Sequence, residues 1–258
     1  MGNKNTLIAQ LSDVHIAAQG HEKDKWDSAE HLSRAVEMLV EMQPAVDLVL
    51  ISGDLGCEGT VAEYRRLKGL LAPLSVPVRL MMGNHDRRAA LRAVFDEHRY
   101  LGSEGFCHYA VDLGDVRVVA LDSVDEGEDG GLLCDERLAW LESTLNERAQ
   151  QPTVVAVHHP PFESGLWRMD QMRLAQPERL EALVRDFPQV QRVVCGHLHH
   201  SMMVGFAGLM AISSPALAFG LNFDSRHGVR LKASKQGIGF LLHEVLKGQH
   251  WATRYIGL

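Results

Sequence analysis

The amino-acid sequence predicts an α/β fold, arranged as a four-layer α/β/β/α sandwich. Short runs of Val, Ile and Leu alternate with longer segments of helical periodicity, which is typical of a mostly parallel sheet covered by helices. After about residue 202 the pattern changes, and strand-like segments follow one another with turns between them. Because no repeat or linker divides the 258 residues, we expect a single domain over 1–258 with a mainly β C-terminal portion over 202–258.

Six apolar runs have the length and composition of buried strands. In chain order they cover residues 7–11, 48–52, 78–82, 116–121, 154–157 and 192–195. The C-terminal portion adds three predicted strands, over residues 209–212, 239–245 and 251–256. We expect these three strands to form an additional, largely antiparallel part of the structure.

Helices are predicted between the strands, where apolar residues recur three and four positions apart. The first has an apolar stripe that starts at Leu32, with Asp27 as its start signal. Ahead of the second, Thr60 and Glu63 form a T-x-x-E capping box. Two further helices are expected to begin near residues 135 and 177.

The chain is acidic and contains few cysteines. Its formal net charge of −7 argues against a long footprint on nucleic acid or on an anionic membrane. The four cysteines are far apart in the sequence and form no CxxC pair, so we expect free thiols rather than a disulfide framework. No segment approaches the roughly 18 uninterrupted apolar residues of a membrane span. The sequence therefore predicts a cytoplasmic protein that contacts neither nucleic acid nor a membrane.

Polar side chains that can bind metals follow five of the predicted strands directly. They are Asp13 and His15, Asp54, Asn84 with His85 and Asp86, His158 with His159, and His197 with His199. In an open α/β sheet, ligands bind beyond the carboxyl ends of the strands, so these side chains should meet at one edge. Gly53, Gly83 and Gly196 adjoin them and permit tight turns and close backbone approach.

The donor types in this set indicate transition metals. Carboxylate, amide and imidazole groups together suit Fe, Mn, Zn or Co. Cysteine is absent from the set, which argues against a structural zinc site. A single D-x-H or H-x-H segment is weak evidence, because a lone histidine at a strand end usually only forms hydrogen bonds. The complete ordered set is far more specific.

The ordered blocks D-x-H, GD, GNH-D/E, H and GH-x-H resemble those of the calcineurin-like metallophosphoesterase superfamily. They extend here from Asp13 to His199, which is most of the chain. The run from His158 to Pro161 and the segment from Gly196 to His199 look most like the bacterial branch that holds class III cyclic-nucleotide phosphodiesterases and glycerophosphodiesterases. The resemblance implies the sandwich fold of the metallophosphoesterase type.

The same resemblance implies a role for each residue of the set. One metal ion would be bound by Asp13, His15 and His199. The other would be bound by Asn84, His158 and His197, and Asp54 would bridge the two ions. His85 would be a catalytic histidine beside the substrate that binds no metal. Many relatives carry Thr-Asp where this chain has Gly56-Cys57, so the support around the ligands is expected to differ.

The activity that the resemblance implies is hydrolysis of a small phosphodiester by a hydroxide that bridges the two metals. The substrate would be a cyclic nucleotide or a glycerophosphodiester. Phosphomonoester hydrolysis is the nearest alternative, because the same metals serve both reactions. A nuclease would need a basic track, and a non-catalytic scaffold should have lost ligands that are all present here. The oligomeric state stays open, with a homo-oligomer among the alternatives.

Residues near the set have less specific patterns. We expect His159 to be structural and, if its segment is extended, to point away from His158. Asp86 could orient a neighbouring residue or cap a helix that begins near Arg87, and we favour the cap. Asp122 fits a turn and the support of a ligand equally well. The loops over residues 163–172 and 215–227 fit walls of the site, packed surface loops or oligomer contacts equally well, and neither indicates a specificity residue.

Overall fold

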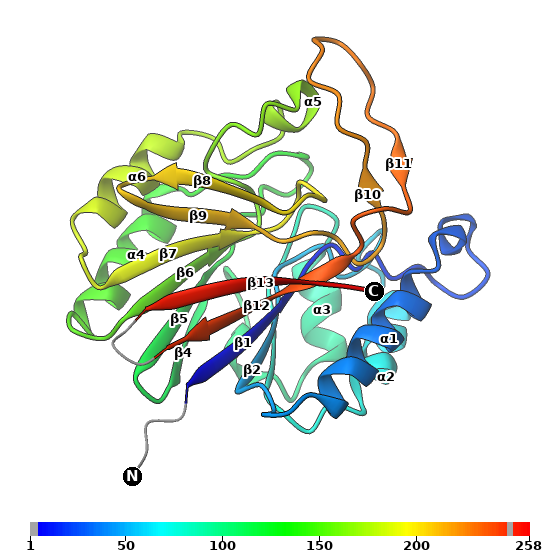
Figure 1. The fold of residues 1–258 in the computed structure, drawn as a ribbon, viewed down its shortest axis with the longest axis horizontal. Coiled ribbons are helices and arrows are strands. Elements are labelled where there is room, and N and C mark those ends of the chain that lie inside the picture. The colour runs from blue at the N-terminus through cyan, green and yellow to red at the C-terminus, as the bar shows by residue number, and fades with distance from the viewer. Residues whose placement is uncertain (1–4, 247–249) are drawn as a thin grey trace.

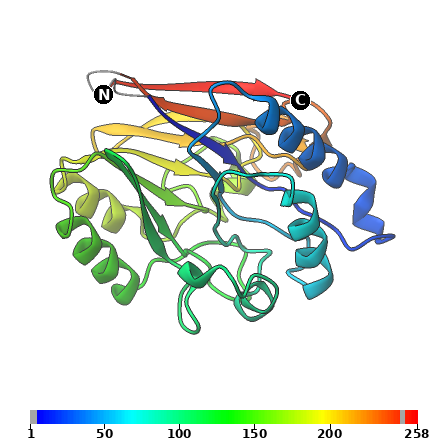
Figure 2. The same ribbon diagram turned by 90° about the horizontal axis from the view of Figure 1, so that it is seen from below.

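Two β-sheets pack face to face in the middle of the molecule, and helices cover the outer face of each (Figure 1; Figure 2). The computed structural model describes residues 5–246 and 250–258, with residue 24 described by its backbone only. The predicted four-layer α/β/β/α sandwich is confirmed. The single-domain organisation over 1–258 stays a prediction, and residues 1–4 and 247–249 lie outside the described ranges. No helix within those ranges is long and apolar enough to cross a membrane.

The first sheet has five strands in the order β13-β12-β1-β2-β3. Its parallel part consists of β1 (Thr6–Leu11), β2 (Leu48–Ile51) and β3 (Val78–Leu80). On the other side of β1, the sheet is extended in antiparallel fashion by β12 (Gly239–Val245) and β13 (Trp251–Gly257). The end of the chain therefore pairs with its first strand.

The second sheet has six strands in the order β4-β5-β6-β7-β9-β8. Four of them are parallel neighbours, namely β5 (Val116–Leu121), β6 (Thr153–Val157), β7 (Val190–Cys195) and β9 (Leu209–Ser213). The antiparallel edges are β4 (Tyr109–Leu113) and β8 (Met202–Phe206). A separate short hairpin joins β10 (Gly220–Leu221) to β11 (Ala233–Ser234).

The sequence predicts that the strands after residue 202 form an additional part of the structure. This prediction is wrong, because the long strands of this region belong to the two main sheets. β8 and β9 extend the second sheet, and β12 and β13 extend the first. The sequence also misses β4 and β8, the two edges of the second sheet. β8 alternates between half-buried and exposed residues, and β4 is mostly half-buried, so neither has the fully buried run of the central strands.

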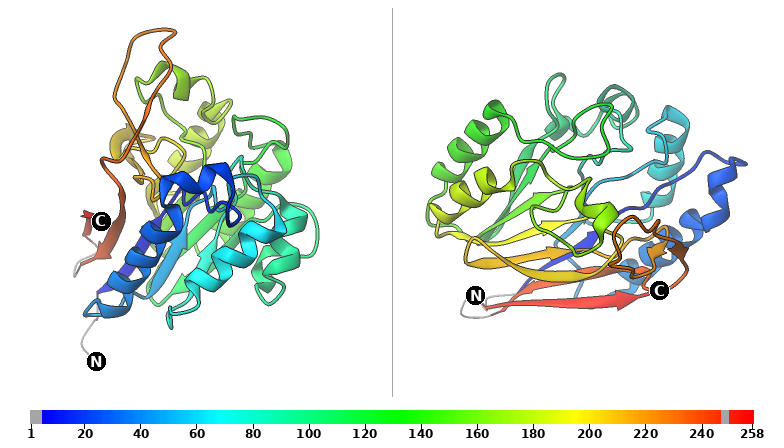
Figure 3. Two further views of the ribbon diagram at one scale, coloured as in Figure 1. Left: turned by 90° about the vertical axis from the view of Figure 1, so that its right-hand side faces the viewer. Right: turned by 90° about the horizontal axis from the view of Figure 1, so that it is seen from above.

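The outer layers are helical. The first sheet is covered by α1 (Ser28–Glu41), α2 (Val61–Leu71) and α3 (Arg88–Val94), and the second by α4 (Asp135–Asn146) and α6 (Pro177–Arg185). Three short helices, η1 (Glu22–Trp26), η2 (Arg99–Leu101) and α5 (Trp167–Asp170), lie in the connections. Figure 3 shows α5 and the β10–β11 hairpin projecting at the same end of the molecule.

Two of the predicted helix starts can be compared with the structure. The capping box ahead of α2 is confirmed, because the Thr60 side chain accepts from the Glu63 backbone N–H and the Glu63 carboxylate accepts from the Thr60 N–H. Asp27 does precede α1. It has a left-handed backbone with φ of 57° and makes no side-chain capping bond.

Strand β1 shows how the layers are separated. Leu7, Ala9 and Leu11 pack against the helices of the first sheet, whereas Ile8 faces the core between the two sheets. Gln10 is buried on that same inner face, and its amide Nε2 donates to the Ser52 hydroxyl at 2.9 Å and to the Cys195 carbonyl at 2.9 Å. A polar side chain therefore joins the two sheets just below the ends of β2 and β7.

Gln10 belongs to a buried hydrogen-bond network that reaches the edge of the first sheet. Its Oε1 accepts from His243 Nε2 at 2.9 Å, and His243 Nδ1 lies 2.9 Å from the Thr253 hydroxyl. Arg192 donates to the same hydroxyl at 2.7 Å. Burial, assisted by the nearby Arg192 guanidinium, lowers the pKa of His243 to about 3. The imidazole is therefore neutral, with its proton on Nε2.

This neutral histidine should make the fold sensitive to acid. Its folded-state pKa lies below the unfolded value of about 6.5, so its contribution to stability is present above that pH and is lost as the pH falls towards 3. Between about pH 8 and pH 5 the single group accounts for about 2 kcal/mol. In urea unfolding of metal-free protein, we expect His243→Gln to lose less stability over this range than the unsubstituted chain does. Equal losses would contradict the assignment.

Candidate metal centre

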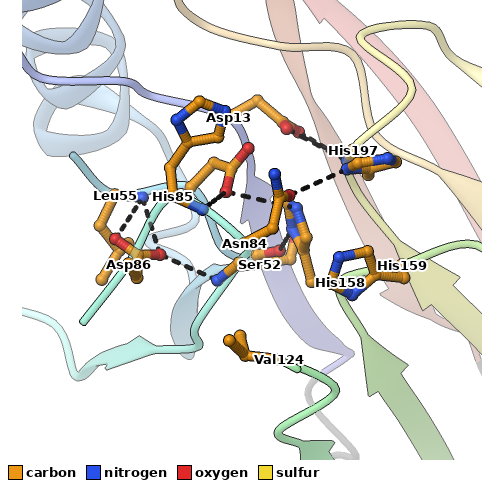
Figure 4. Close-up of polar contacts among 12 residues, drawn as sticks. Asp13, Ser52, Leu55, Asn84, His85, Asp86, Val124, His158, His159 and His197 are labelled. Atoms are coloured by element: carbon orange, nitrogen blue, oxygen red, sulfur yellow. Dashed lines mark hydrogen bonds and ion pairs between the residues drawn. The ribbon is translucent and has the colours of Figure 1, made fainter. Parts of the chain in front are cut away.

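The predicted ligands meet where strands of both sheets end. Asp13 follows β1, Asp54 follows β2 and Asn84 follows β3, so the first sheet supplies half of the site. His158 follows β6 and His197 follows β7, which bring the second sheet to the same place. Figure 4 shows the side chains of Asp13, Asn84, His158 and His197 facing one another. The site is thus built by both layers at once.

Asp54 lies at the centre of the group. Its Oδ2 is 3.4 Å from His15 Nε2, and its Oδ1 is 3.5 Å from His158 Nε2. Oδ1 also accepts from the backbone N–H of His85 at 3.1 Å. The two oxygens of one buried carboxylate therefore face histidines on two different sides.

Asp13, His15 and His199 form the first of these sides. His15 Nε2 and His199 Nε2 are 3.2 Å apart, and His199 Nε2 lies 3.5 Å from Asp13 Oδ1. All three side chains are buried, and the distances between their donor atoms are short enough for one metal ion to bind all three. The Asp13 carboxylate also accepts from the His197 backbone N–H, at 3.0 and 3.1 Å.

Asn84, His158 and His197 form the second side. Asn84 Oδ1 lies 3.2 Å from His197 Nδ1. The Nε2 atoms of His158 and His197 are buried and have no hydrogen-bond partner among the described residues. Unpartnered buried nitrogens are costly, which indicates that a ligand absent from the protein chain completes them.

The side-chain orientations fit metal binding. His158 Nδ1 lies 2.8 Å from the Ser52 carbonyl, and His199 Nδ1 lies 2.7 Å from the Phe219 carbonyl. A carbonyl can only accept, so each ring donates from Nδ1 and turns its Nε2 towards the centre. Oxygen and imidazole donors without sulfur suit Fe, Mn, Zn or Co.

Charge in the site is strongly coupled. Burial alone would raise the pKa of Asp54, but the surrounding histidines, His158 first, outweigh it and hold that pKa well below its usual value. Burial would likewise lower the pKa of His158, but the Asp54 carboxylate raises it to about 9. In the protein alone, positive imidazole thus compensates a buried carboxylate, which is the compensation that a metal cation would provide.

The backbone at the site is strained. Five of the seven predicted ligands have positive φ angles although none is glycine: Asp13 (51°), His15 (40°), Asp54 (52°), His197 (70°) and His199 (54°). Each such residue costs of order 1–3 kcal/mol and persists only where the surrounding packing demands it. Strain concentrated at ligand positions indicates a functional site rather than a chance cluster.

Two glycines leave the space that the ligands occupy. A Cβ on Gly83 would lie 2.2 Å from Asp54 Oδ1 and 2.7 Å from His158 Nε2. A Cβ on Gly196 would lie 2.1 Å from the Ser12 hydroxyl and 2.9 Å from Asp13 Oδ2. The close approach expected from the sequence therefore has a specific cause at both positions.

His85 lies beside this group and is half-buried. Its Nδ1 donates to the Cys57 carbonyl at 2.8 Å, and its ring meets His15 edge-on with centroids 4.8 Å apart. Burial would lower the pKa of His85, but the Asp54 carboxylate and the Cys57 carbonyl raise it above its usual value. Cys57, where the chain departs from the family pattern, thus orients this histidine through its backbone.

The prediction that Asp86 caps a helix is wrong. Helix α3 begins at Arg88 without a side-chain cap. The Asp86 carboxylate instead accepts from the backbone N–H groups of Leu55 and Gly83 and from the Tyr64 hydroxyl, as Figure 4 shows in part. Asp86 thereby connects the loop that carries Asp54 with the loop that carries Asn84. These contacts join segments distant in the sequence, so no local sequence pattern predicts them.

His159 is not in an extended segment, so the condition under which it would point away from His158 is not met. The chain bends at both residues, and the His159 ring lies 5.0 Å from the rings of His158 and His197. Its Nδ1 forms a 2.7 Å hydrogen bond with the Ser123 hydroxyl, as expected of a supporting residue. Asp122 both closes a turn, by accepting from the Val124 N–H, and binds the Arg88 guanidinium through two bonds of 2.8 and 2.9 Å.

A cavity of about 350 Å³ opens onto the site. Six of the predicted residues line it: His15, Asp54, Asn84, His85, His197 and His199. Asp13 and His158 lie deeper and are fully buried. The loop over residues 163–172 contributes Met169 and Met172, and that over 215–227 contributes Phe219 and Leu221. Trp26 completes this apolar lining, and the sequence offered no motif that would have found it.

The fold and this cluster of buried carboxylates and histidines define a metal-dependent phosphoesterase. The chain belongs to the calcineurin-like phosphoesterase family, whose model matches residues 6–201. The family prediction from the ordered motifs is therefore confirmed.

Individual relatives cover most of the chain. The sequence is 28% identical to the probable glycerophosphodiester phosphodiesterase GpdQ of Arcobacter nitrofigilis, over 97% of this chain and 93% of that protein. It is 33% identical to the 3′,5′-cyclic adenosine monophosphate phosphodiesterase CpdA of Pseudomonas aeruginosa, over 82% of this chain and 76% of that protein. A dimetal phosphatase of Danio rerio has the same fold at 16% identity, with a TM-score of 0.72 over 98% of this chain and 96% of that one.

The glycine positions yield a matched test of the site. We expect Gly83→Ala to abolish or strongly reduce metal uptake, because the new methyl group would occupy space held by the Asp54 carboxylate and the His158 imidazole. The control is Gly69→Ala in helix α2, where a methyl group meets nothing within 4 Å and should add about 0.5–1 kcal/mol of stability. Metal content after dialysis against manganese would be measured for both folded variants. Full uptake by Gly83→Ala would refute this packing account.

Proposed function

We propose that this protein hydrolyses small phosphodiesters at a two-metal centre. One ion would be held by Asp13, His15 and His199, and the other by Asn84, His158 and His197. Asp54 would be shared between them. The observation that carries the proposal is the Asp54 carboxylate, whose two oxygens face His15 on one side and His158 on the other.

The residues around the centre would bind and orient the phosphate. When bound, the two metal ions supply Lewis-acid charge and make water a potent nucleophile near neutral pH. The Nδ1 hydrogen bonds of His158 and His199 hold their rings in place, which keeps the donor geometry fixed before substrate arrives. Fe, Mn, Zn and Co all suit these donors.

His85 is positioned to act on the substrate directly. Its Nδ1 is engaged by the Cys57 carbonyl, so its Nε2 is the nitrogen left for the cavity that it lines. The raised pKa favours the protonated ring, which can donate a hydrogen bond to a phosphoryl oxygen or a proton to the leaving alkoxide. Both actions stabilise charge that develops as the ester bond breaks.

A diester is favoured as the substrate class by the relatives. One is named a glycerophosphodiester phosphodiesterase and another a cyclic adenosine monophosphate phosphodiesterase. Both names describe phosphodiesters, which supports the same class here. The net charge of −7 supports a small substrate rather than a nucleic-acid chain.

The proposal is tested by an activity screen after metal reconstitution. Hydrolysis of bis(p-nitrophenyl) phosphate, a diester, would be compared with that of p-nitrophenyl phosphate, a monoester. We expect a higher kcat/KM for the diester. A higher value for the monoester would make the protein a phosphomonoesterase, and no hydrolysis with any of the four metals would favour a non-catalytic scaffold.

His85→Ala separates catalysis from metal binding. We expect it to lower kcat by about 10²–10⁴-fold, because a positioned proton donor is lost. Metal content should stay at the unsubstituted level, since His85 is not among the proposed ligands. His250→Ala, at an exposed histidine just before β13, is the control and should keep full activity. An unchanged kcat in His85→Ala would remove His85 from the mechanism.

A further inference from the structure

One side of the cavity is apolar although its floor is made of polar metal-site residues. We call this side the apolar wall, and its members are Trp26, Met169, Met172, Phe219 and Leu221. They come from three separate segments: η1, the loop around α5, and the chain that enters β10. Apolar side chains that line a pocket together with a few polar groups are typical of a ligand-binding site.

The apolar wall begins directly at the proposed metal ligands. The Phe219 ring lies 4.5 Å from the His199 ring and 5.7 Å from the His15 ring, nearly parallel to the latter. The Phe219 carbonyl accepts a hydrogen bond from His199 Nδ1 at 2.7 Å. The Trp26 ring packs on the Phe219 ring with centroids 5.0 Å apart. A group attached to a phosphate at the metal site would therefore reach this wall at once.

A second aromatic contact joins two of the segments that carry the apolar wall. Trp167, at the start of α5, packs against His227 in the β10–β11 hairpin with ring centroids 4.4 Å apart. Figure 1 shows α5 and the β10–β11 hairpin projecting at the same side of the molecule. Their contact links the loop that carries Met169 and Met172 to the hairpin that carries Leu221, so the apolar surface is preorganised.

Charged groups are found in the lining beside the wall. Lys23 lines the cavity and its Nζ is 3.1 Å from the Glu58 carboxylate. Asp129 also lines it and lies 4.0 Å from the Arg168 guanidinium. A ligand that fills this space should thus have an apolar body and polar atoms at its edge.

We infer that the apolar wall binds a nucleobase carried by the phosphodiester, and that it selects nucleotide diesters over glycerol diesters. This inference rests on the proposed function. A flat heteroaromatic ring buries apolar surface against the aromatic and thioether side chains and leaves its edge nitrogens to Lys23 and Asp129. A glycerol arm has no apolar ring to bury against these side chains and gains less from them. A long acyl chain would exceed a cavity of about 350 Å³ and offer no polar atoms to Lys23 and Asp129.

The test uses two ligands that differ only by the base. Adenosine 5′-monophosphate and ribose 5-phosphate would be titrated calorimetrically into the manganese-loaded full chain. We expect the ligand with the base to bind about tenfold more tightly, a ratio typical of one buried apolar group. In Trp26→Ala and in Met172→Ala this ratio should fall towards one, and Trp26→Phe should restore most of it.

Met203→Ala provides the matched control. This methionine is 64% exposed on edge strand β8, is not part of the cavity lining, and should leave the ratio unchanged. Far-UV circular dichroism would establish that each variant is folded. Trp26 and Met172 lie in different segments, so a fall in the ratio in both variants cannot come from the local disruption of one segment.

The outcomes separate this inference from the proposed function. Equal affinities for the two ligands, or a ratio that no apolar-wall variant changes, would overturn the inference even if diesters are hydrolysed. A ratio that depends on the wall would support it even if the activity screen fails. Turnover of adenosine 3′,5′-cyclic phosphate at a higher kcat/KM than glycerophosphoethanolamine is the result expected when both hold.

Discussion

The carboxylate of Asp54 is buried among histidines at the junction of two sheets, and the arrangement of the surrounding residues depends on its charge. An isolated buried charge would be too costly, so it must be compensated by imidazolium or by bound cations. Its two oxygens face His15 on one side and His158 on the other. Because β2 supplies Asp54 and β6 supplies His158, this compensation requires both sheets to be correctly packed. The site is therefore complete only when the two sheets are packed together.

Several costly features follow from this constraint. The backbone takes left-handed angles at five of the seven predicted ligands, including Asp13 and His199. Gly83 and Gly196 remove side chains from the space beside the carboxylates. Below them, the network from Gln10 to His243 joins the sheets through buried polar groups instead of apolar packing. We interpret the network as a means of fixing the relative position of the two sheets, which apolar packing alone specifies less strictly.

Much of this could be predicted from the sequence, because the ligands lie next to the ends of the strands that carry them. The central strands are continuous apolar runs and the capping box at Thr60 is local, so these also followed from pattern alone. Sequence patterns did not predict three other features: the role of Asp86, the direction of His159 and the apolar wall around Trp26. Each depends on contacts between segments distant in the sequence, such as Asp86 with Tyr64. The edge strands β4 and β8 were missed for a related reason, since partly exposed residues give a weaker apolar signal.

The central claim is that Asp54 is shared by two metal ions held on its two sides. A crystal structure of manganese-loaded protein, with an anomalous difference map, tests this most directly. The account predicts two strong peaks that flank the Asp54 carboxylate, one beside His15 and His199 and the other beside His158 and His197. Absence of peaks, a single peak, or peaks that do not contact Asp54 would contradict it.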